Sequence, residues 1–514
     1  MAFTAGMNSA LAAMLKAALD PSDPSHAPAF VPSAAAPAGP LPVAVLGVPF
    51  DSLTIPEAIR RIDAMIASQR THYVVTANVD FLVQAHRDVE LRRILLDADL
   101  VLCDGTPLVW ASRWLGNPLP ERVAGSDLAP ALLQSAAEKG HRVFLLGAAD
   151  GVAAAATERL QQQDPLLQVV GHYAPPFSAL LEMNHDEILR RVQAARPDIL
   201  LVSFGCPKQE KWIAMHHRAL GVPVTIGVGA TLDFLAGRKK RAPRWMRRTG
   251  TEWFYRLAQE PRRLYKRYAW DVVYFAPLLA QQWWRLRTRP HAASRAQELP
   301  LKNPRWRAVD AGTHLTRAAL RGQSDFWREL QTSGQHCLVD CAHLQSIDAT
   351  GIAFLLRWRT LLQRCNQQLV LLAPSQAIRR ILSQLKLTDH FSVADNEATA
   401  RQKSERLFTR CVLVRRGETR SLAWCGEIVA ANADEVWHLS LSHFQTFTDH
   451  ATTLIIVDLA QLRFIDSSGA ALMLRLKRWT QSRHVEVLFS NPQENVRHVL
   501  RLTALDHLLL EGGQ

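Results

Sequence analysis

The sequence is poor in cysteine and contains no long apolar run. Its seven cysteines include no C-x-x-C pair, so neither a disulfide framework nor a zinc site is indicated, and a reducing cytosol is expected. No uninterrupted apolar stretch reaches the ~18 residues of a membrane span. The best candidate, Tyr268 to Ala280, has thirteen residues and contains Asp271 and Pro277. The N-terminus also lacks a basic segment ahead of an apolar core, so no secretory signal is predicted.

The 514 residues are enough for roughly three domains of 100 to 200 residues each. Residues 1–40 are rich in Ala and Pro and are predicted to be a disordered leader. From 41 to 237, short apolar runs alternate with amphipathic stretches, which is typical of an α/β fold with a parallel sheet covered by helices on both faces. The predicted strands are Val43 to Leu46, Tyr73 to Thr76, Leu100 to Cys103, Val143 to Leu146, Gln168 to Gly171, Ile199 to Phe204 and Val224 to Val228.

Polar residues follow three of these strands, where ligands bind in open α/β sheets. Asp104, in CDGTP, is a carboxylate on a tight turn that could accept a proton from a bound hydroxyl, or it could be a turn or helix-cap residue. Thr76 and Asn78, in TAN, could orient a substrate or cap the next helix. Gln209 and Glu210 fall in the first turn of a predicted helix, where a carboxylate often only complements the helix dipole.

Two further patterns are weaker. GAADG, residues 147–151, lies at a strand-to-helix junction but does not match G-x-G-x-x-G. Asp97 and Asp99 form a D-x-D tripeptide of a kind that can hold a metal-bound nucleotide sugar. They precede their strand, at the end opposite the expected site, so a solvated helix end is the preferred interpretation.

The basic residues are concentrated between Arg238 and Arg289. This stretch holds fifteen Lys and Arg against three Asp and Glu, which accounts for nearly the whole net charge of +13. It also holds five of the fourteen Trp and four of the six Tyr. Interleaved cations and amphipathic rings are typical of segments that bind an anionic lipid surface or a nucleic acid.

Six blocks, taken in order, resemble the WecG/TagA/CpsF glycosyltransferases over about residues 43–270. They read TAN, ADLVLCDGTPLVWASRWLG, ERVAGSDL, FGCPKQEKW, GVGATLDFLAG and RAPRWMRRTGTEWFYRLAQEPRR. The resemblance implies a Rossmann-like domain that transfers N-acetylmannosamine or a related sugar, with inversion, from a UDP-sugar to a polyprenyl-diphosphate-linked acceptor. It also implies that no metal or other cofactor is required.

The same resemblance implies roles for individual residues. Asp104 matches the general base, and Thr76 and Asn78 match residues that position the reacting sugars. The donor side is expected to include Arg122, Asp127, Gly147, Gln209, Glu210 and Gly229.

Without a metal, the two diphosphates need cationic partners, and the basic stretch can supply them. Arg241, Arg256 and Arg263 match basic positions of the family's C-terminal appendage, whereas Lys266 stands where an arginine is expected. Residues 238–289 are therefore predicted to dock the enzyme on the cytoplasmic face of the plasma membrane as a peripheral protein.

The second half contains an internal repeat after a linker at residues 290–303. CLVDCAHLQSIDATGIAFLLRW, from Cys337, aligns with IIVDLAQLRFIDSSGAALMLRL, from Ile455. Both copies, at 304–398 and 406–512, resemble STAS domains, small α/β domains of anti-sigma-factor antagonists and sulphate transporters. In the STAS family, the resemblance implies, the residue after the aspartate is a serine that can be phosphorylated. This position is Ser467 in the second copy, whereas in the first copy it is Ala349, which has no hydroxyl. Ser467 could instead cap its helix.

The sequence thus predicts a membrane-associated glycosyltransferase of bacterial surface or exopolysaccharide assembly, with two STAS-like domains that bind an unidentified protein partner. One alternative is a regulatory scaffold based on the STAS pair, with an inactive front half; the retained Thr76, Asn78 and Asp104 argue against it. Another is a nucleic-acid binder, which is disfavoured because no helix-turn-helix, RNA-binding or zinc pattern occurs.

Overall fold

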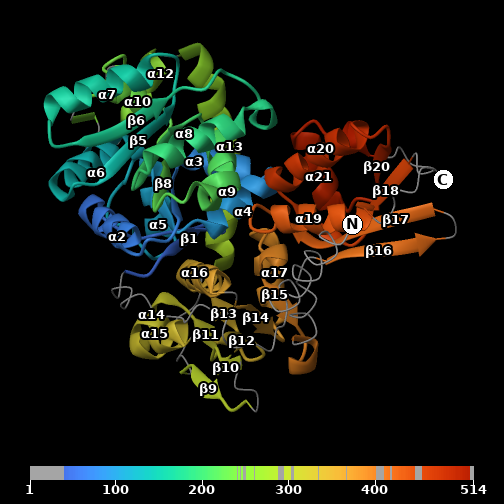
Figure 1. Cartoon of the computed structure of the whole chain (residues 1–514). Helices are drawn as coiled ribbons and strands as arrows, with labels where there is room; N and C mark the ends of the chain where they lie inside the picture. The colour runs from blue at the N-terminus through green and yellow to red at the C-terminus, as the bar shows by residue number, and fades with distance from the viewer. Residues whose placement is uncertain are drawn as a thin grey trace.

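The computed structural model describes residues 40–509 except 240, 244, 247–250, 260, 287–294, 302–305, 334, 366, 401–409, 417–418 and 446–453. Residues 1–39 of the predicted leader, and half of the predicted linker, lie outside the described residues. Figure 1 shows three α/β units: a large N-terminal unit in blue and green, a yellow-orange unit beside its hairpin β1–β2, and an orange-red unit beside its helices α4 and α9.

A six-stranded, wholly parallel sheet forms the centre of the N-terminal unit, with strand order β4-β3-β8-β7-β5-β6. Five of its strands are mostly buried apolar runs, as expected for a sheet covered on both faces, whereas the edge strand β6 is only partly buried. Six of the seven predicted strands are in this sheet. The bounds are β3 His72–Ala77, β4 Leu100–Cys103, β5 Arg142–Gly147, β6 Gln168–Tyr173, β7 Ile199–Ser203 and β8 Val224–Gly227.

The seventh predicted strand was assigned to the wrong sheet. Val43–Val45 (β1) pairs antiparallel with Val48–Phe50 (β2), and the two form a separate hairpin. Gly47, with φ +80°, supplies the left-handed conformation that this tight turn needs. Helices outside the main sheet bury this strand, so it is apolar. Its composition therefore resembles that of the strands in the six-stranded sheet.

Helices cover both faces of the six-stranded sheet. One face packs against α2 (Ile55–Ala67), α6 (Gly125–Lys139), α7 (Val152–Gln163) and α10 (Thr231–Leu235). The other packs against α3 (Val79–Ala85), α4 (Val89–Asp97), α5 (Thr106–Trp114), α8 (His185–Ala195) and α9 (Lys208–Leu220).

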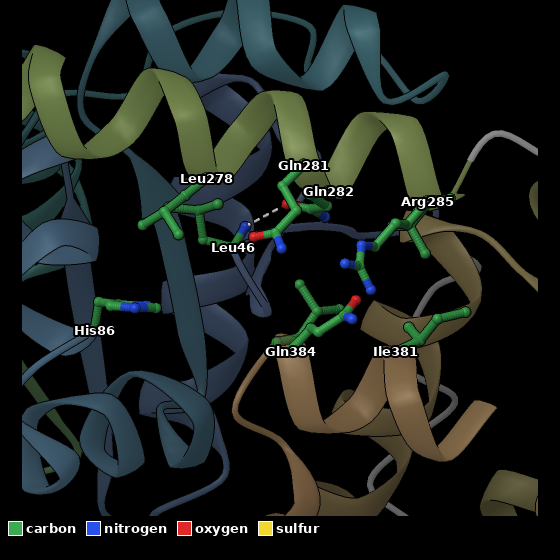
Figure 2. A pocket seen from close by; sticks show the side chains of 10 residues that line it. Leu46, His86, Leu278, Gln281, Gln282, Arg285, Ile381 and Gln384 are labelled. Carbon is green, nitrogen blue, oxygen red and sulfur yellow. Dashed lines mark hydrogen bonds between the residues drawn. The ribbon is translucent and has the colours of Figure 1, made fainter. Parts of the chain in front are cut away.

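The basic stretch forms two helices, α12 (Glu252–Gln259) and α13 (Pro261–Leu286). Phe275 and Leu279 on α13 are buried in the same core as the hairpin. The buried Gln282 accepts a hydrogen bond from Leu46 N at 2.7 Å and donates one to Ala44 O at 2.8 Å. Figure 2 shows this contact beside a narrow crevice between α13 and the second unit, lined by Gln281, Arg285, Ile381 and Gln384 among others. One face of α13 is therefore part of the protein core.

The first repeat has a five-stranded sheet in the order β15-β14-β12-β10-β9 and a short parallel pair, β11 with β13. Gln297–Leu299 (β9), predicted to be linker, is instead an edge strand that pairs antiparallel with β10. A three-residue polar edge strand has no apolar pattern that would reveal it. The bounds are β10 Trp306–Asp310, β11 His314–Leu315, α14 Arg317–Gly322, α15 Ser324–Thr332, β12 His336–Asp340, β13 Ser346–Ile347, α16 Ala349–Arg364, β14 Leu369–Leu372, α17 Gln376–Gln384 and β15 Ser392–Ala394.

The second repeat has the sheet order β16-β17-β18-β20, with β19 also paired to β17. Each repeat has a helix that begins directly after its I-D motif, and both helices are capped by that aspartate. The bounds are β16 Arg410–Arg416, β17 Thr419–Ile428, α19 Ala433–Gln445, β18 Leu454–Asp458, β19 Leu462–Ile465, α20 Ser467–Gln481, β20 Glu486–Ser490 and α21 Glu494–Leu502.

Candidate active site

The carboxyl ends of β3, β4 and β8 lie side by side, because β3 pairs in parallel with both neighbours. Asp104 N donates to Ala77 O at 2.8 Å, which ties the tip of β4 to that of β3. Thr76 Oγ1 donates to Gly227 O of β8 at 3.3 Å. The fold therefore brings Thr76, Asn78 and Asp104 together at the edge where open α/β sheets bind ligands.

Asp104 is half-buried, and the positive charge of Arg122 lies close to it. Val123 N donates to Cys103 O at 2.8 Å, which holds the Arg122 loop against the tip of β4. Burial lowers the pKa of Arg122, but its bond to Glu252 and the charges of Asp104 and Asp127 raise it overall. The guanidinium of Arg122 and the carboxyl group of Asp104 are therefore close enough for their charges to interact, and a charged carboxylate is the form that can accept a proton.

Asn78 and Thr76 both have structural bonds. Asn78 is the N-cap of α3, and its side-chain oxygen accepts from Phe81 N at 3.3 Å. Thr76 is buried, and Gly125 at the start of α6 packs against its hydroxyl. The helix-cap alternative thus holds for Asn78, and the sugar-positioning roles of both residues stay predictions.

Gln209 and Glu210 are buried at the start of α9. Gln209 Oε1 accepts from Gly205 N and from Gly229 N, each at 3.2 Å, while Gln209 Nε2 donates to Glu210 Oε1 at 2.6 Å. Burial raises the pKa of Glu210 to about 7. The described bonds of Gln209 join the loops after β7 and β8, and the assignment of both side chains to the donor side stays a prediction.

Gly147, the last residue of β5, has a conformation and a packing that require glycine. Its φ is +97°, and a Cβ there would lie 2.6 Å from Ser203 O. The neighbouring Ala148 N donates to the same carbonyl oxygen at 2.7 Å. The backbones of β5 and β7 therefore approach closely at this end of the sheet, beside the predicted donor site.

We expect Gly147→Ala to lower the free energy of unfolding by about 2 kcal/mol or more, because left-handed strain adds to a backbone clash. Denaturant unfolding checks this. Gly221→Ala is the matched control, since Gly221 has φ +67° with no atom within 4 Å of the added Cβ, and it should cost only ~1 kcal/mol. Equal costs for the two variants would contradict the proposed close approach.

A network of ion pairs connects the basic appendage to the tip of β4. Arg122 bonds Asp127 and Glu252 of α12, both at 2.7 Å. Arg241 reaches the other oxygen of Asp127, also at 2.7 Å, and donates to Ser126 Oγ at 2.8 Å. Arg122, Asp127 and Arg241 are therefore brought together on the same side of the sheet as Asp104.

The remaining predicted phosphate ligands are described less completely. The backbones of Arg256 and Arg263 belong to α12 and α13, but their side chains lie outside the described residues. Lys266 is exposed on α13. The assignment of these three to an acceptor diphosphate stays a prediction.

The appendage presents aromatic residues to solvent on the side that does not pack on the core. Trp253, Trp270 and Trp284 are 49%, 56% and 72% exposed. In the described part of the chain, no helix is both long enough and apolar enough to cross a membrane. The other large exposed side chains of this segment are Trp245, Phe254, Tyr265, Val272, Val273 and Trp283.

The sequence suggested that the D-x-D residues form a solvated helix end. The structure shows instead that both carboxylates form ion pairs. Asp97 pairs with Arg359 at 3.0 Å, and Asp99 pairs with Arg364, both on α16 of the first repeat. Burial alone raises the pKa of Asp97, but Arg359 and Arg93 hold it below the usual value. The two carboxylates bind another domain, a partner that local sequence does not reveal.

Ser467 does not cap its helix. Asp466 is the N-cap of α20, accepting from Ser468 N and Gly469 N, and Ser467 is the first helical residue. It is fully buried against the N-terminal unit. Its predicted phosphorylation is untested.

Among the described residues, no group of three or more His, Cys, Asp or Glu side chains is arranged to hold a metal ion. Metal independence stays a prediction.

The sequence matches the models of two known protein families. The family model described as "Glycosyl transferase WecG/TagA/CpsF family" matches residues 43–289, and that of the STAS domain matches 315–400 and 412–511. Enzymes named N-acetylglucosaminyldiphosphoundecaprenol N-acetyl-beta-D-mannosaminyltransferase, from Staphylococcus aureus strains MW2 and MRSA252, are each 34% identical over 224 residues. The match covers 43% of this chain and 86% of each relative.

Among solved structures, unphosphorylated SpoIIAA, an anti-sigma factor antagonist, is 24% identical, with 21% of this chain and 90% of that chain covered and a TM-score of 0.17. The chain carries two STAS domains, and through residues 43–289 it belongs to the WecG/TagA/CpsF family of glycosyltransferases.

Proposed function

We propose that this glycosyltransferase moves N-acetylmannosamine, or a closely related sugar, from a UDP-sugar to a polyprenyl-diphosphate-linked acceptor. The reaction inverts the anomeric centre, needs no metal, and takes place at the cytoplasmic face of the membrane during surface or exopolysaccharide assembly. The names of the staphylococcal relatives support both the sugar and the lipid-linked acceptor.

In the proposed mechanism, Asp104 takes the proton of the acceptor hydroxyl as its oxygen attacks the anomeric carbon. The carbon–oxygen bond to UDP breaks in line, and UDP leaves with the bonding electron pair. Arg122 lies beside Asp104 and is held by Glu252 and Asp127, so its charge is fixed before the reaction. A preorganised cation stabilises negative charge that develops in the transition state without further reorganisation.

The observation that carries the proposal is the bridge from Arg241 through Asp127 to Arg122. It attaches the start of the basic appendage to the tip of β4, next to Asp104. A membrane-bound appendage would therefore hold the reacting carboxylate near a lipid-borne diphosphate. Nine large exposed side chains on the same appendage support lipid contact.

The test is incubation of the full chain with radiolabelled UDP-sugars and short polyprenyl-diphosphate-linked sugars in vesicles. We expect the lipid product to be labelled when the donor is UDP-N-acetylmannosamine or a close relative. EDTA should not reduce the amount of labelled product. NMR of the product should show that the configuration at the anomeric carbon is inverted relative to the donor. If no donor labels any lipid acceptor, the regulatory scaffold with an inactive transferase half becomes the better account.

A further inference from the structure

The crevice between α13 and α17 has one wall in the transferase and one in the first STAS domain (Figure 2). Leu46 and Leu286 line it from the transferase, and Leu385 lines it from the STAS domain. All three are buried in one continuous core, which fixes the two walls relative to each other. The polar side chains that line the crevice are His86, Gln281, Gln282, Arg285 and Gln384.

The arginines beside the crevice have no carboxylate to balance them. Arg285 lines the crevice, and among the described residues no aspartate or glutamate does. The buried Arg92 donates to Leu46 O at 3.1 Å and to Leu385 O, both of which are neutral carbonyl groups. Burial lowers the pKa of Arg92 to about 10, which leaves its guanidinium charged at neutral pH. Within the part of the chain that the structure describes, neither arginine forms an ion pair.

His86 shows how positive the region is. Lys386 Nζ donates to His86 O at 2.6 Å, and Arg87 is the next residue along the chain. Burial, followed by the charges of Lys386, Arg92 and Arg87, lowers the pKa of His86 to about 4. The imidazole is therefore neutral at pH 7, while the cations around it stay unbalanced. A positive recess with low-dielectric walls attracts anions.

The polar side chains of the crevice include the donors that a phosphate group requires. Figure 2 shows the guanidinium of Arg285, from α13, and the side-chain amide of Gln384, from α17, pointing toward one another, with Gln281 pointing into the same crevice. A guanidinium fork and amide N–H groups donate well to phosphate oxygens. Arg285 and Gln281 are exposed, so solvent and lipid can reach both. One anion bound between these side chains would contact both domains.

The neighbouring tryptophans indicate a lipid as the source of this phosphate. Trp283 and Trp284 directly precede Arg285 on α13, and they are 37% and 72% exposed. Exposed tryptophans of a membrane-bound helix lie at the level of the headgroups. A cation in the next position of the same helix then lies at the depth of the lipid phosphates. A site for a free anion would have no need of these rings.

We propose that the crevice between α13 and the first STAS domain binds the phosphate group of an anionic membrane phospholipid, with Arg285, Gln281 and Gln384 as donors. The inference rests on the proposed membrane docking of the appendage, and it adds the first STAS domain to the surface that contacts lipid. Charge complementarity and the continuity of the crevice with the exposed tryptophans of α13 carry it.

The test is hydrogen exchange on the full chain with neutral vesicles of phosphatidylcholine and with anionic vesicles that hold equal parts of phosphatidylcholine and phosphatidylglycerol. We expect exchange in residues 376–386 of α17 to slow by about threefold or more with the anionic vesicles, because a bound ligand stabilises the segment that holds it. Neutral vesicles should leave α17 unchanged. Inorganic phosphate at the same phosphate concentration should not protect α17, and protection by phosphate alone would overturn the lipid assignment.

Gln384→Glu tests the STAS wall without any change in the appendage. The added carboxylate would repel a lipid phosphate, so protection of α17 by anionic vesicles should be lost while protection of α13 remains. Gln481→Glu is the matched control, since Gln481 is the last residue of α20 just as Gln384 is the last residue of α17. It should keep the protection that wild type shows.

Arg285→Glu tests the appendage wall. Its binding to anionic vesicles should weaken by about fivefold or more, since each basic residue at such a surface contributes about that much. Arg218→Glu makes the same charge change at another exposed arginine in the last turn of a helix, and it should bind within about twofold of wild type. Equal losses in the two variants would show an effect of net charge alone and would overturn the site.

The wild-type comparison needs no variant and separates this proposal from the proposed function. If anionic vesicles protect α13 while α17 exchanges as in the free protein, the crevice binds no lipid and docking through the appendage stands. If neither helix is protected, membrane docking fails as well. Sugar transfer to a short, water-soluble acceptor measures the proposed reaction independently of both results.

Discussion

Asp104→Asn is expected to lower the rate of sugar transfer by a factor of about 10² to 10⁴, the usual contribution of a positioned general base. The amide has nearly the same shape as the carboxylate but cannot take the acceptor proton. The main-chain bond from residue 104 to Ala77 O does not involve the side chain and should persist. The loss should therefore appear in kcat for a saturating acceptor, with the unfolding midpoint almost unchanged.

The control for this experiment is Asp186→Asn, which removes the same charge from an exposed position in the first turn of α8. It should keep wild-type turnover within about twofold, since surface substitutions of this kind have small effects. Equal turnover by Asp104→Asn and wild type would remove Asp104 from the role of base. Loss of donor binding in Asp104→Asn would place it in substrate binding instead.

Much of the fold could be predicted because the governing patterns are local. The strands of the six-stranded sheet are short apolar runs bounded by turns, and their predicted ends differ from the observed ends by at most two residues. The position of Asp104 follows from the rule that ligands gather at the carboxyl ends of parallel strands. The repeat in the second half was visible by direct alignment of two segments, for which no tertiary information is needed.

Contacts between domains could not be predicted, because they depend on partners hundreds of residues away. Asp97 and Asp99 have the composition of a solvated helix end, yet their partners are Arg359 and Arg364. Glu252 forms an ion pair with Arg122, and the sequence analysis did not predict this role. An acidic residue in so basic a stretch was nevertheless a signal that it could form a specific ion pair. Nothing in the sequence around Ser467 indicates Glu90 as its neighbour.

Replacing the exposed tryptophans of the appendage is expected to separate the enzyme from its lipid substrate. In Trp253→Ser/Trp270→Ser/Trp284→Ser, binding to anionic vesicles should fall more than tenfold, because these rings would otherwise sit at the level of the headgroups. Turnover on a polyprenyl acceptor in vesicles should fall with it, while turnover on a short, water-soluble acceptor stays within about twofold. Vesicle sedimentation and the two activity assays provide the measurements.

Substitution is a sharper test than deletion of residues 238–289. The buried face of α13 carries Phe275 and the Gln282 bonds to the hairpin, so truncation would uncover the core and confuse unfolding with loss of docking. Leu166→Ser with Phe177→Ser, two exposed apolar residues outside the appendage, is the matched control and should bind vesicles as wild type does. If the triple variant keeps its vesicle binding and its turnover, the appendage is not a lipid anchor. If the wild type binds DNA or RNA as well as it binds vesicles at equal salt, the appendage is not specific for lipid.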